Sequence, residues 1–268
     1  MIGGNILARP KRWETVGFEN GIGEYRFSSW KYYANYIQDE MLNYNAYIWR
    51  GQNQENWKLQ PSLDRIFKGN NKSPSGITRA KHLEAFKYAV RGRRGLNPPT
   101  LKDENEWWAL GQHQGLLTPL LDWTTSPYVA AYFAYFKKTE DVNKRIAIFA
   151  LHKPSIERKS NEIIQGYKSK GRPPVIEFVN PLSDDNLRLV NQGGLFTRSP
   201  DNISVEEWVN EHFIGYNRVV LLKMTFPNKE REFVLQSLNR MNINHLSLFP
   251  DLYGASQYSN LELQIAKY

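Results

Sequence analysis

The sequence has no cysteine among its 268 residues. This absence excludes disulfides, thiolate metal sites and a cysteine nucleophile. Long apolar runs are lacking too, because the longest one, 129–136, is less than half of the length that a membrane-spanning helix requires. The amino terminus also lacks the apolar stretch of a secretory signal. We therefore expect a cytoplasmic protein that has no membrane partner.

The composition nevertheless indicates a folded, basic protein. Hydrophobic residues make up 41% and aromatic residues 13% of the chain, which is enough to bury a sizeable core. The formal net charge is +8, and a surface of this sign attracts polyanions. We therefore expect a nucleic acid or a nucleotide as partner, although many basic proteins bind nothing through charge alone. The basic residues are scattered, apart from a short run at 91–94.

Helical and strand patterns alternate along the chain without a regular βαβ rhythm. Apolar periodicity and capping residues predict helices at 28–41, 78–90, 104–113, 127–138 and 229–241, and a last helix after Asp251. Short apolar runs predict strands at 46–50, 145–152, 175–179, 187–191 and 218–225, and a turn-rich loop at 52–76.

This order of elements favours an α+β fold with a central, mostly antiparallel sheet and flanking helices. There is no glycine-rich phosphate loop and no internal repeat. No linker divides the chain. We therefore expect a single domain, 1–268, in which 1–45 form an amino-terminal helical part and 46–268 form the α+β core.

Arg50 is the first candidate for a functional residue. It ends the apolar strand predicted at 46–50 and is followed by Gly51, which places it where a strand opens onto a cleft. Its guanidinium presents a fixed fork of donors that suits phosphate or carboxylate groups. The alternative is a structural salt bridge at the end of the strand.

Gln112 and His113 are the next candidates. They lie in the last turn of the helix predicted at 104–113, which Gly115 ends. The pKa of histidine lies near neutrality, so His113 is suited to acid–base work or to phosphate binding. The alternative is an ordinary residue at a helix carboxyl terminus. The other four histidines lack the spacing of metal ligands, so no metal site is predicted.

The segment Asp122-Trp-Thr124-Thr125-Ser126 places an acid and three hydroxyls between a strand and a helix. Ser126 before Pro127 is explained by helix capping. Capping does not explain Asp122, Thr124 or Thr125. A helix amino terminus also leaves N–H groups that can bind an anion, so the segment is a candidate binding site.

Several other residues have structural interpretations. We expect three tryptophans, Trp107, Trp108 and Trp123, to belong to the core rather than to stack on bases. Glu206 and Glu207 are interpreted as the solvated start of a helix, where acidic residues are favoured. Asp251 is interpreted as the N-cap of the last helix or as a turn residue.

Several ordered blocks of this sequence resemble the FRG domain, a family named for an aromatic-arginine-glycine motif. These blocks are Trp49-Arg-Gly-Gln52, Trp57-Lys-Leu-Gln-Pro-Ser62, Trp107-Trp108, Gln112-His-Gln-Gly115, Leu121-Asp-Trp-Thr-Thr-Ser-Pro127, Gln192-Gly-Gly-Leu-Phe196 and Leu248-Phe-Pro-Asp-Leu252. The resemblance extends over residues 25–258. It brings little functional information with it.

A more distant resemblance is to the ADP-ribosyltransferases. These enzymes carry an arginine on an early strand, a Ser-Thr-Ser strand that leads into a helix, and a later glutamate. Arg50 and Thr124-Thr125-Ser126 match the first two motifs, but no Gln-X-Glu or Glu-X-Glu follows. The resemblance implies an ADP-ribosyltransferase-like fold with NAD as cofactor. In place of the glutamate, the range 187–196 offers Arg188 and Gln192, and Glu177 lies on the preceding predicted strand. Gln192 can hydrogen-bond a ribose hydroxyl but cannot act as a general base.

The leading hypothesis is therefore an NAD-using, ADP-ribosyltransferase-like cleft, in a protein that would suit a toxin or phage-defence effector. The catalytic candidates are Arg50, His113, Asp122 and Gln192. The cofactor-binding candidates are Arg50, Gly51, Gln112, Thr124, Thr125 and Ser126. The first alternative is a module that binds nucleic acid or a nucleotide without turnover. The second is a nuclease or other hydrolase that uses Asp122 and His113.

Overall fold

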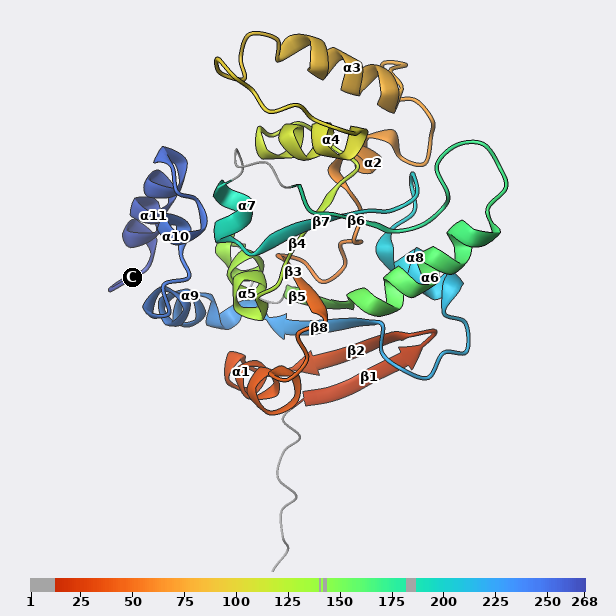
Figure 1. Ribbon diagram of the computed structural model, residues 1–268. Coiled ribbons are helices and arrows are strands. Elements are labelled where there is room, and N and C mark those ends of the chain that lie inside the picture. Colours follow the sequence, from red (N-terminus) through yellow and green to blue (C-terminus); the bar gives the residue numbers. More distant parts are fainter. Residues whose placement is uncertain (1–12, 140, 142–143, 182–186) are drawn as a thin grey trace, which may run out of the picture.

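The computed structural model describes residues 13–139, 141, 144–181 and 187–268. These residues form an eight-stranded sheet in the order β1-β2-β8-β5-β3-β4-β7-β6 (Figure 1). Only β2 and β8 pair in parallel within it, and the other neighbours pair antiparallel. The α+β class with a mostly antiparallel sheet is thus confirmed.

The strands have the following bounds: β1 Trp13–Glu19, β2 Ile22–Phe27, β3 Tyr47–Gln52, β4 Leu121–Thr124, β5 Arg145–His152, β6 Glu177–Val179, β7 Gly194–Arg198 and β8 Leu221–Pro227. The helices are α1 Trp30–Tyr36, which continues as the π-helix Ile37–Met41, then α2 Ser62–Phe67, α3 Arg79–Ala89, α4 Glu104–His113, α5 Pro127–Phe136, α6 Lys153–Gly166, α7 Leu187–Asn191, α8 Val205–His212, the 3₁₀ turn Asn228–Glu230, α9 Arg231–Arg240, α10 His245–Leu248 and α11 Leu252–Gln264.

Both faces of the sheet are covered, and β5 shows how. Its alternate residues Ile146, Ile148 and Ala150 belong to the core beneath α1, α5 and α9. The residues between them belong to the opposite core, beneath α6 and α8. This alternation follows from the two-residue period of a strand. A third core joins α2, α3 and α4 around Trp108, above the β6–β7 end of the sheet (Figure 1).

Two features of the sheet position the candidate site. Helix α5 packs directly on β3 at Gly51, where a Cβ atom would lie 1.8 Å from the carbonyl oxygen of Ala130. In addition, the ladder between β3 and β4 consists of one residue pair, Trp49 and Thr124. The sheet therefore has a seam between β3 and β4, directly beside Arg50.

Several predicted elements agree with the structure. The helix predicted at 104–113 and the strand predicted at 145–152 have those bounds as α4 and β5. Ser126 caps α5, because its side chain accepts a hydrogen bond from the backbone N–H of Val129. The expected burial of tryptophans is confirmed at Trp108 and Trp123, which are 0% and 3% exposed.

Other predictions were wrong. The range 187–191, predicted as a strand, is helix α7, and the strand of this region is β7. The short pattern Leu-Arg-Leu-Val fits a helix turn as well as a strand, and Gly193 with a φ of +53° separates the two elements. The predicted loop 52–76 contains α2, and α6 was not predicted at all.

The amino-terminal part, 1–45, is not only helical. Residues 13–27 form the hairpin β1–β2, and α1 with its π-helical extension follows. The hairpin turns at Asn20-Gly21, where both residues have positive φ angles, 47° and 79°. A tight turn of this kind favours Asn-Gly, because both central residues must adopt the left-handed region. Residues 1–12 lie outside the described residues.

Glu206 also differs from its interpretation as a solvated residue. Both of its carboxylate oxygens accept the backbone N–H of Leu59 at 2.9 Å. Burial raises the pKa of the Glu206 carboxyl. Its neighbour Glu207 is about half exposed and forms the capping box of α8 with Ser204.

Within the part of the chain that the structure describes, no helix has the length and apolar character needed to cross a membrane.

Candidate functional site

A cavity of about 350 Å³ lies beside the seam of the sheet. Its walls come from β3, β4, the end of α4, α5, α7 and the segment after α10. Seven of the predicted site residues line it: Arg50, Gly51, Gln112, His113, Asp122, Thr124 and Gln192. Most of the remaining wall is aromatic or aliphatic: Trp49, Trp123, Ala130, Phe133, Leu189, Phe196 and Phe249.

Arg50 reaches across the seam from β3 to β4. Its Nη1 donates a hydrogen bond to the backbone carbonyl of Asp122 at 2.7 Å, and the carboxylate oxygen Oδ2 of Asp122 lies 3.7 Å away. Burial lowers the pKa of the guanidinium and Asp122 opposes this effect, yet an arginine remains charged in either case. The side chain of Arg50 is 21% exposed and that of Asp122 is 58% exposed. A fixed cation and an accessible carboxylate thus share one cavity.

The carboxylate of Asp122 is held from the other side by α4. Gln112 donates from Nε2 to Oδ2 of Asp122 at 2.9 Å. The Oε1 atom of Gln112 accepts a hydrogen bond from the hydroxyl of Thr118, and that hydroxyl accepts from the N–H of Leu120 at 3.2 Å. Gln112 therefore orients Asp122. His113, in the same helical turn, is half-buried in the cavity wall.

The three hydroxyls of the Thr-Thr-Ser segment do not converge. Thr124 is in the cavity wall, where its Oγ1 donates to the carbonyl of Gln192 at 2.6 Å and accepts from the N–H of Ser126 at 3.1 Å. Ser126 caps α5. Thr125 is exposed and lines a separate cavity with Gly193 and Lys153. Of the three residues, only Thr124 faces the site that Arg50 lines.

Gln192 closes the wall opposite the strands. It follows α7, and its Nε2 donates to the carbonyl of Leu248 at 3.1 Å. Its own carbonyl accepts the hydrogen bond from Thr124. Gln192 therefore connects β4, α7 and α10, which is a positioning role at the cavity.

Among the described residues, no three His, Asp or Glu side chains gather closely enough to hold a metal ion.

Residues 45–143 match the family model of the FRG domain. This chain carries an FRG domain. The match covers β3, α4, β4 and α5, and so includes Arg50, Gln112, His113, Asp122 and Thr124. The comparisons with curated proteins and with solved structures find no match.

The rest of the cavity lies beyond the matched FRG segment. Arg188 on α7 and Phe249 after α10 line the cavity, but neither was predicted as a site residue. Arg188 donates from Nε to Oδ2 of Asp251 at 2.7 Å, and its guanidinium lies over the rings of Phe249 and Tyr253 at 5.3 and 5.6 Å. The block 248–252, noted above as part of the FRG resemblance, was the available signal, because it joins an aromatic residue to an acid.

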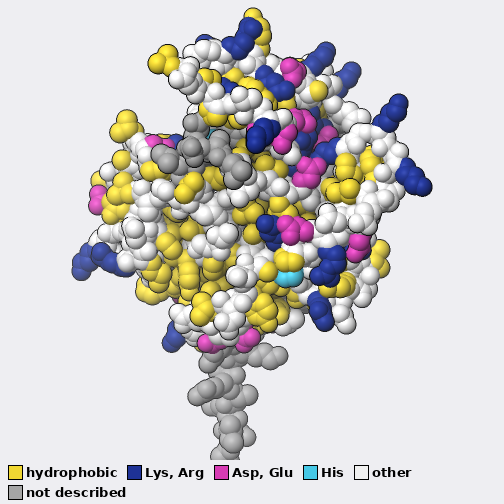
Figure 2. Space-filling model, in the orientation of Figure 1, with side chains coloured by type: hydrophobic (Ala, Val, Ile, Leu, Met, Phe, Trp, Pro, Cys, Tyr) yellow, Lys and Arg dark blue, Asp and Glu magenta, His cyan; other side chains and the backbone are white. Residues whose placement is uncertain are grey.

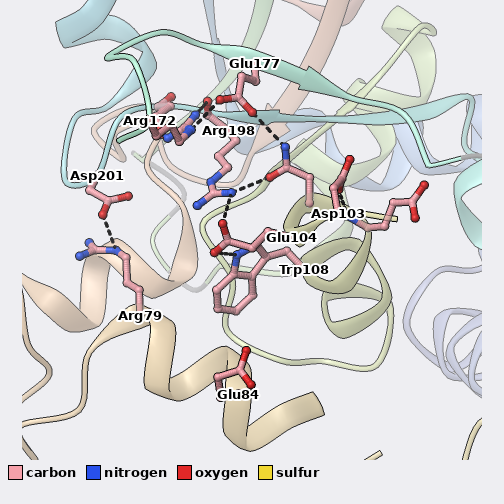
Figure 3. A network of polar contacts seen from close by, with 12 residues as sticks. Arg79, Glu84, Asp103, Glu104, Trp108, Arg172, Glu177, Arg198 and Asp201 are labelled. Atoms are coloured by element: carbon pink, nitrogen blue, oxygen red, sulfur yellow. Dashed lines mark hydrogen bonds and ion pairs between the residues drawn. The ribbon is translucent and has the colours of Figure 1, made fainter. Parts of the chain in front are cut away.

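Helix α4 of the FRG domain is fixed by a polar network outside the cavity (Figure 3). Arg198 on β7 donates from Nη1 to Glu104 at 3.3 Å and to Asn105 at 2.7 Å. Asn105 donates to Glu177 at 2.9 Å, and Glu177 also accepts from Arg172 at 2.6 Å. This network holds the start of α4 against β6 and β7. It thereby sets where the last turn of α4 presents Gln112 and His113.

Proposed function

We propose that the cavity binds NAD or a related nucleotide. One observation carries this proposal: Arg50 is held at a mostly aromatic and aliphatic cavity, beside an accessible carboxylate. Guanidinium groups bind phosphate through charge-assisted, bidentate hydrogen bonds, and aromatic walls favour a planar base. The volume, about 350 Å³, is near the lower end of the range of small-molecule pockets, about 300–1,000 Å³. It suits one nucleoside half of a dinucleotide, with the remainder reaching the mouth.

The chemistry that we propose is transfer of the ADP-ribosyl group of NAD. The bond between the ribose and nicotinamide breaks, the bonding electrons leave with nicotinamide, and a nucleophile of the acceptor forms the new bond. Asp122 is the acid among the described residues of the cavity wall. In this proposal its carboxylate stabilises the positive charge that develops on the ribose and accepts the proton of the nucleophile. Gln112 holds Asp122 in place, and His113 and Gln192 flank the bound nucleotide.

The charges on one face of the molecule favour a nucleotide over a nucleic acid as the ligand there. A nucleic-acid interface requires a continuous basic patch or stripe. On the face shown in Figure 2, lysine and arginine side chains are scattered among acidic and apolar ones. This face therefore offers no continuous basic surface for a nucleic acid, while the net charge of +8 still favours anionic ligands in general.

Isothermal titration with NAD and ADP-ribose tests the binding step. We expect saturable binding by the wild-type protein. In Arg50→Ala the affinity should fall at least about tenfold, because the charge-assisted hydrogen bonds between the guanidinium and the phosphate of the ligand are lost. Arg218→Ala is the control, since Arg218 is exposed and does not line the cavity. Absence of binding at millimolar concentrations of both ligands would contradict the proposal.

Asp122→Asn tests the chemical step. The variant keeps the size of the side chain and removes its charge, so we expect it to bind NAD and to release nicotinamide far more slowly than the wild type. Chromatographic measurement of nicotinamide, with and without added protein acceptors, separates transfer from simple hydrolysis. Equal release by Asp122→Asn and the wild type would exclude a catalytic role for Asp122.

A further inference from the structure

A second arginine, Arg188, lines the same cavity as Arg50 but comes from a different part of the fold. Arg50 is on β3, within the FRG match, and Arg188 is on α7, outside it. Both arginines line the described cavity wall together with one acidic residue, Asp122, while Asp251, the ion-pair partner of Arg188, lies behind it. Two guanidinium groups from different parts of the fold can therefore contact one ligand in this cavity.

The guanidinium of Arg188 is held in place before any ligand binds. One oxygen of Asp251, Oδ2, accepts from its Nε at 2.7 Å and also contacts its Nη2. The rings of Phe249 and Tyr253 support its plane, and its side chain remains 29% exposed. A guanidinium has five N–H donors in a rigid fork, so a contact to one carboxylate oxygen does not exhaust it. Arg188 is therefore preorganised, which reduces the entropy lost when it binds an anion.

Asp251 has its own structural function, independent of Arg188. Its other oxygen, Oδ1, accepts the N–H of Gly254 at 2.9 Å and caps α11. A carboxylate is not needed for this cap, because asparagine caps a helix as well as aspartate does. Asparagine at this position would therefore keep the cap of α11 and still offer Arg188 a neutral hydrogen-bond acceptor.

We propose that Arg188 is a second anion-binding residue of the cavity, and that Arg50 and Arg188 together bind the diphosphate of the ligand. This inference rests on the proposed function of the cavity as a nucleotide site. It narrows the ligand class to nucleoside diphosphates and dinucleotides, and it assigns a binding role to α7. A diphosphate has two phosphate groups, and each of the two guanidinium groups can donate hydrogen bonds to one of them.

The competing explanation is that Arg188 only braces α11 through Asp251, and a matched pair of variants separates the two. Arg188→Gln removes the cation and keeps a hydrogen-bonding side chain. Asp251→Asn keeps the α11 cap and an acceptor for Arg188 but removes the charge that competes with a phosphate. A brace would be weakened by either substitution. An anion-binding residue is weakened only by the first.

The experiment is titration of the wild type and the two variants with ADP-ribose and with AMP, with melting temperatures as the check on folding. We expect Arg188→Gln to bind ADP-ribose at least tenfold more weakly, with a smaller loss for AMP. We expect Asp251→Asn to bind ADP-ribose as tightly as the wild type or more tightly, and Arg188→Lys to fall between the wild type and Arg188→Gln.

Three outcomes would overturn the inference. Unchanged binding of ADP-ribose by Arg188→Gln would remove Arg188 from the site and leave the proposed nucleotide function in place. An equal loss in Asp251→Asn would show that Arg188 is a brace, and an equal loss for AMP would exclude the diphosphate. Failure of the wild type to bind ADP-ribose and NAD would instead overturn the proposed function together with this inference.

Discussion

The arginines of the network beneath α4 and those of the cavity have different partners. Arg172 donates to Glu177 and to three backbone carbonyls, those of Ser199, Val175 and Arg198. Arg50 and Arg188 each contact one aspartate whose side chain is partly exposed, and both line the cavity. In the first region the donors stabilise the fold, and in the second they face a space that a ligand can enter. The number of arginines in the sequence does not distinguish these functions, but their partners do.

The largest effect is expected where the cavity meets the core, at Gly51. A Cβ atom there would lie 1.8 Å from the carbonyl oxygen of Ala130, so Gly51→Ala must push α5 away from β3. We expect a loss of more than about 3 kcal/mol in the free energy of unfolding, measured by chemical denaturation. Gly166→Ala is the control, because nothing lies within 4 Å of a Cβ atom at Gly166. Equal stability of the two variants would show that α5 does not pack on β3 in this way.

The second prediction compares Arg50 with Arg79 on α3, another arginine, whose partner is buried. Asp64, 2% exposed, accepts from Nη2 of Arg79 at 2.7 Å, and Arg79→Ala would leave this carboxylate buried without its cation. We expect Arg79→Ala to cost about 3 kcal/mol of stability. Arg50→Ala leaves Asp122, which is 58% exposed, in contact with water, so we expect a loss of less than about 1 kcal/mol.

Urea denaturation of both variants measures this difference. A loss in Arg50→Ala as large as in Arg79→Ala, without an effect on nucleotide binding, would show that Arg50 belongs with the structural arginines. The distinction between the two regions would then be wrong.

The third effect concerns pH and a buried histidine that packs against the wall of the cavity. His245 is 2% exposed, its Nδ1 lies 2.5 Å from the hydroxyl of Tyr132, and its ring stacks on Phe249. Burial lowers the pKa of His245 from 6.5 to about 4. The folded state therefore resists protonation, so its stability is complete above pH 6.5 and declines as the pH falls towards 4. The loss amounts to about 2–3 kcal/mol.

His245→Phe tests the origin of this decline. The variant keeps the ring contacts and loses the hydrogen bond to Tyr132, so it starts less stable at pH 7. It lacks the titrating group, so its unfolding free energy should fall less steeply between pH 6.5 and 4. Parallel curves for the variant and the wild type would show that His245 is not the source.

The sequence was informative where a local pattern determines the local structure. The bounds of α4 follow from its Asp103 cap and from Gly115, and the start of α5 follows from Ser126-Pro127. Asn20-Gly21 was an equally local signal for the β1–β2 hairpin, and it was overlooked. Where a run of apolar residues is short, as in α7, periodicity could not distinguish a helix turn from a strand.

Local patterns predicted the cavity on one side, and on the opposite side Gln192 was predicted only through the resemblance to the ADP-ribosyltransferases. Arg50, Gln112 and Asp122 lie in blocks whose positions at the ends of strands and helices suggested a common cleft. The opposite wall joins α7 to the segment after α10, and no local pattern shows that residues 188 and 249 meet. Such contacts depend on tertiary packing, which also divided Thr124, Thr125 and Ser126 among three different surroundings.

The single residue pair between β3 and β4 has a mechanical consequence. The sheet therefore has two parts that can move relative to each other, β1-β2-β8-β5-β3 and β4-β7-β6, and the seam between β3 and β4 joins them. Arg50 connects the two parts because it donates a hydrogen bond to the backbone carbonyl of Asp122, and the described residues of β3 and β4 form only one backbone pair. A ligand that contacts β3 and β4 at once would restrict the relative motion of the two parts. It would therefore slow hydrogen exchange of the backbone amides of β3 and β4 at the seam.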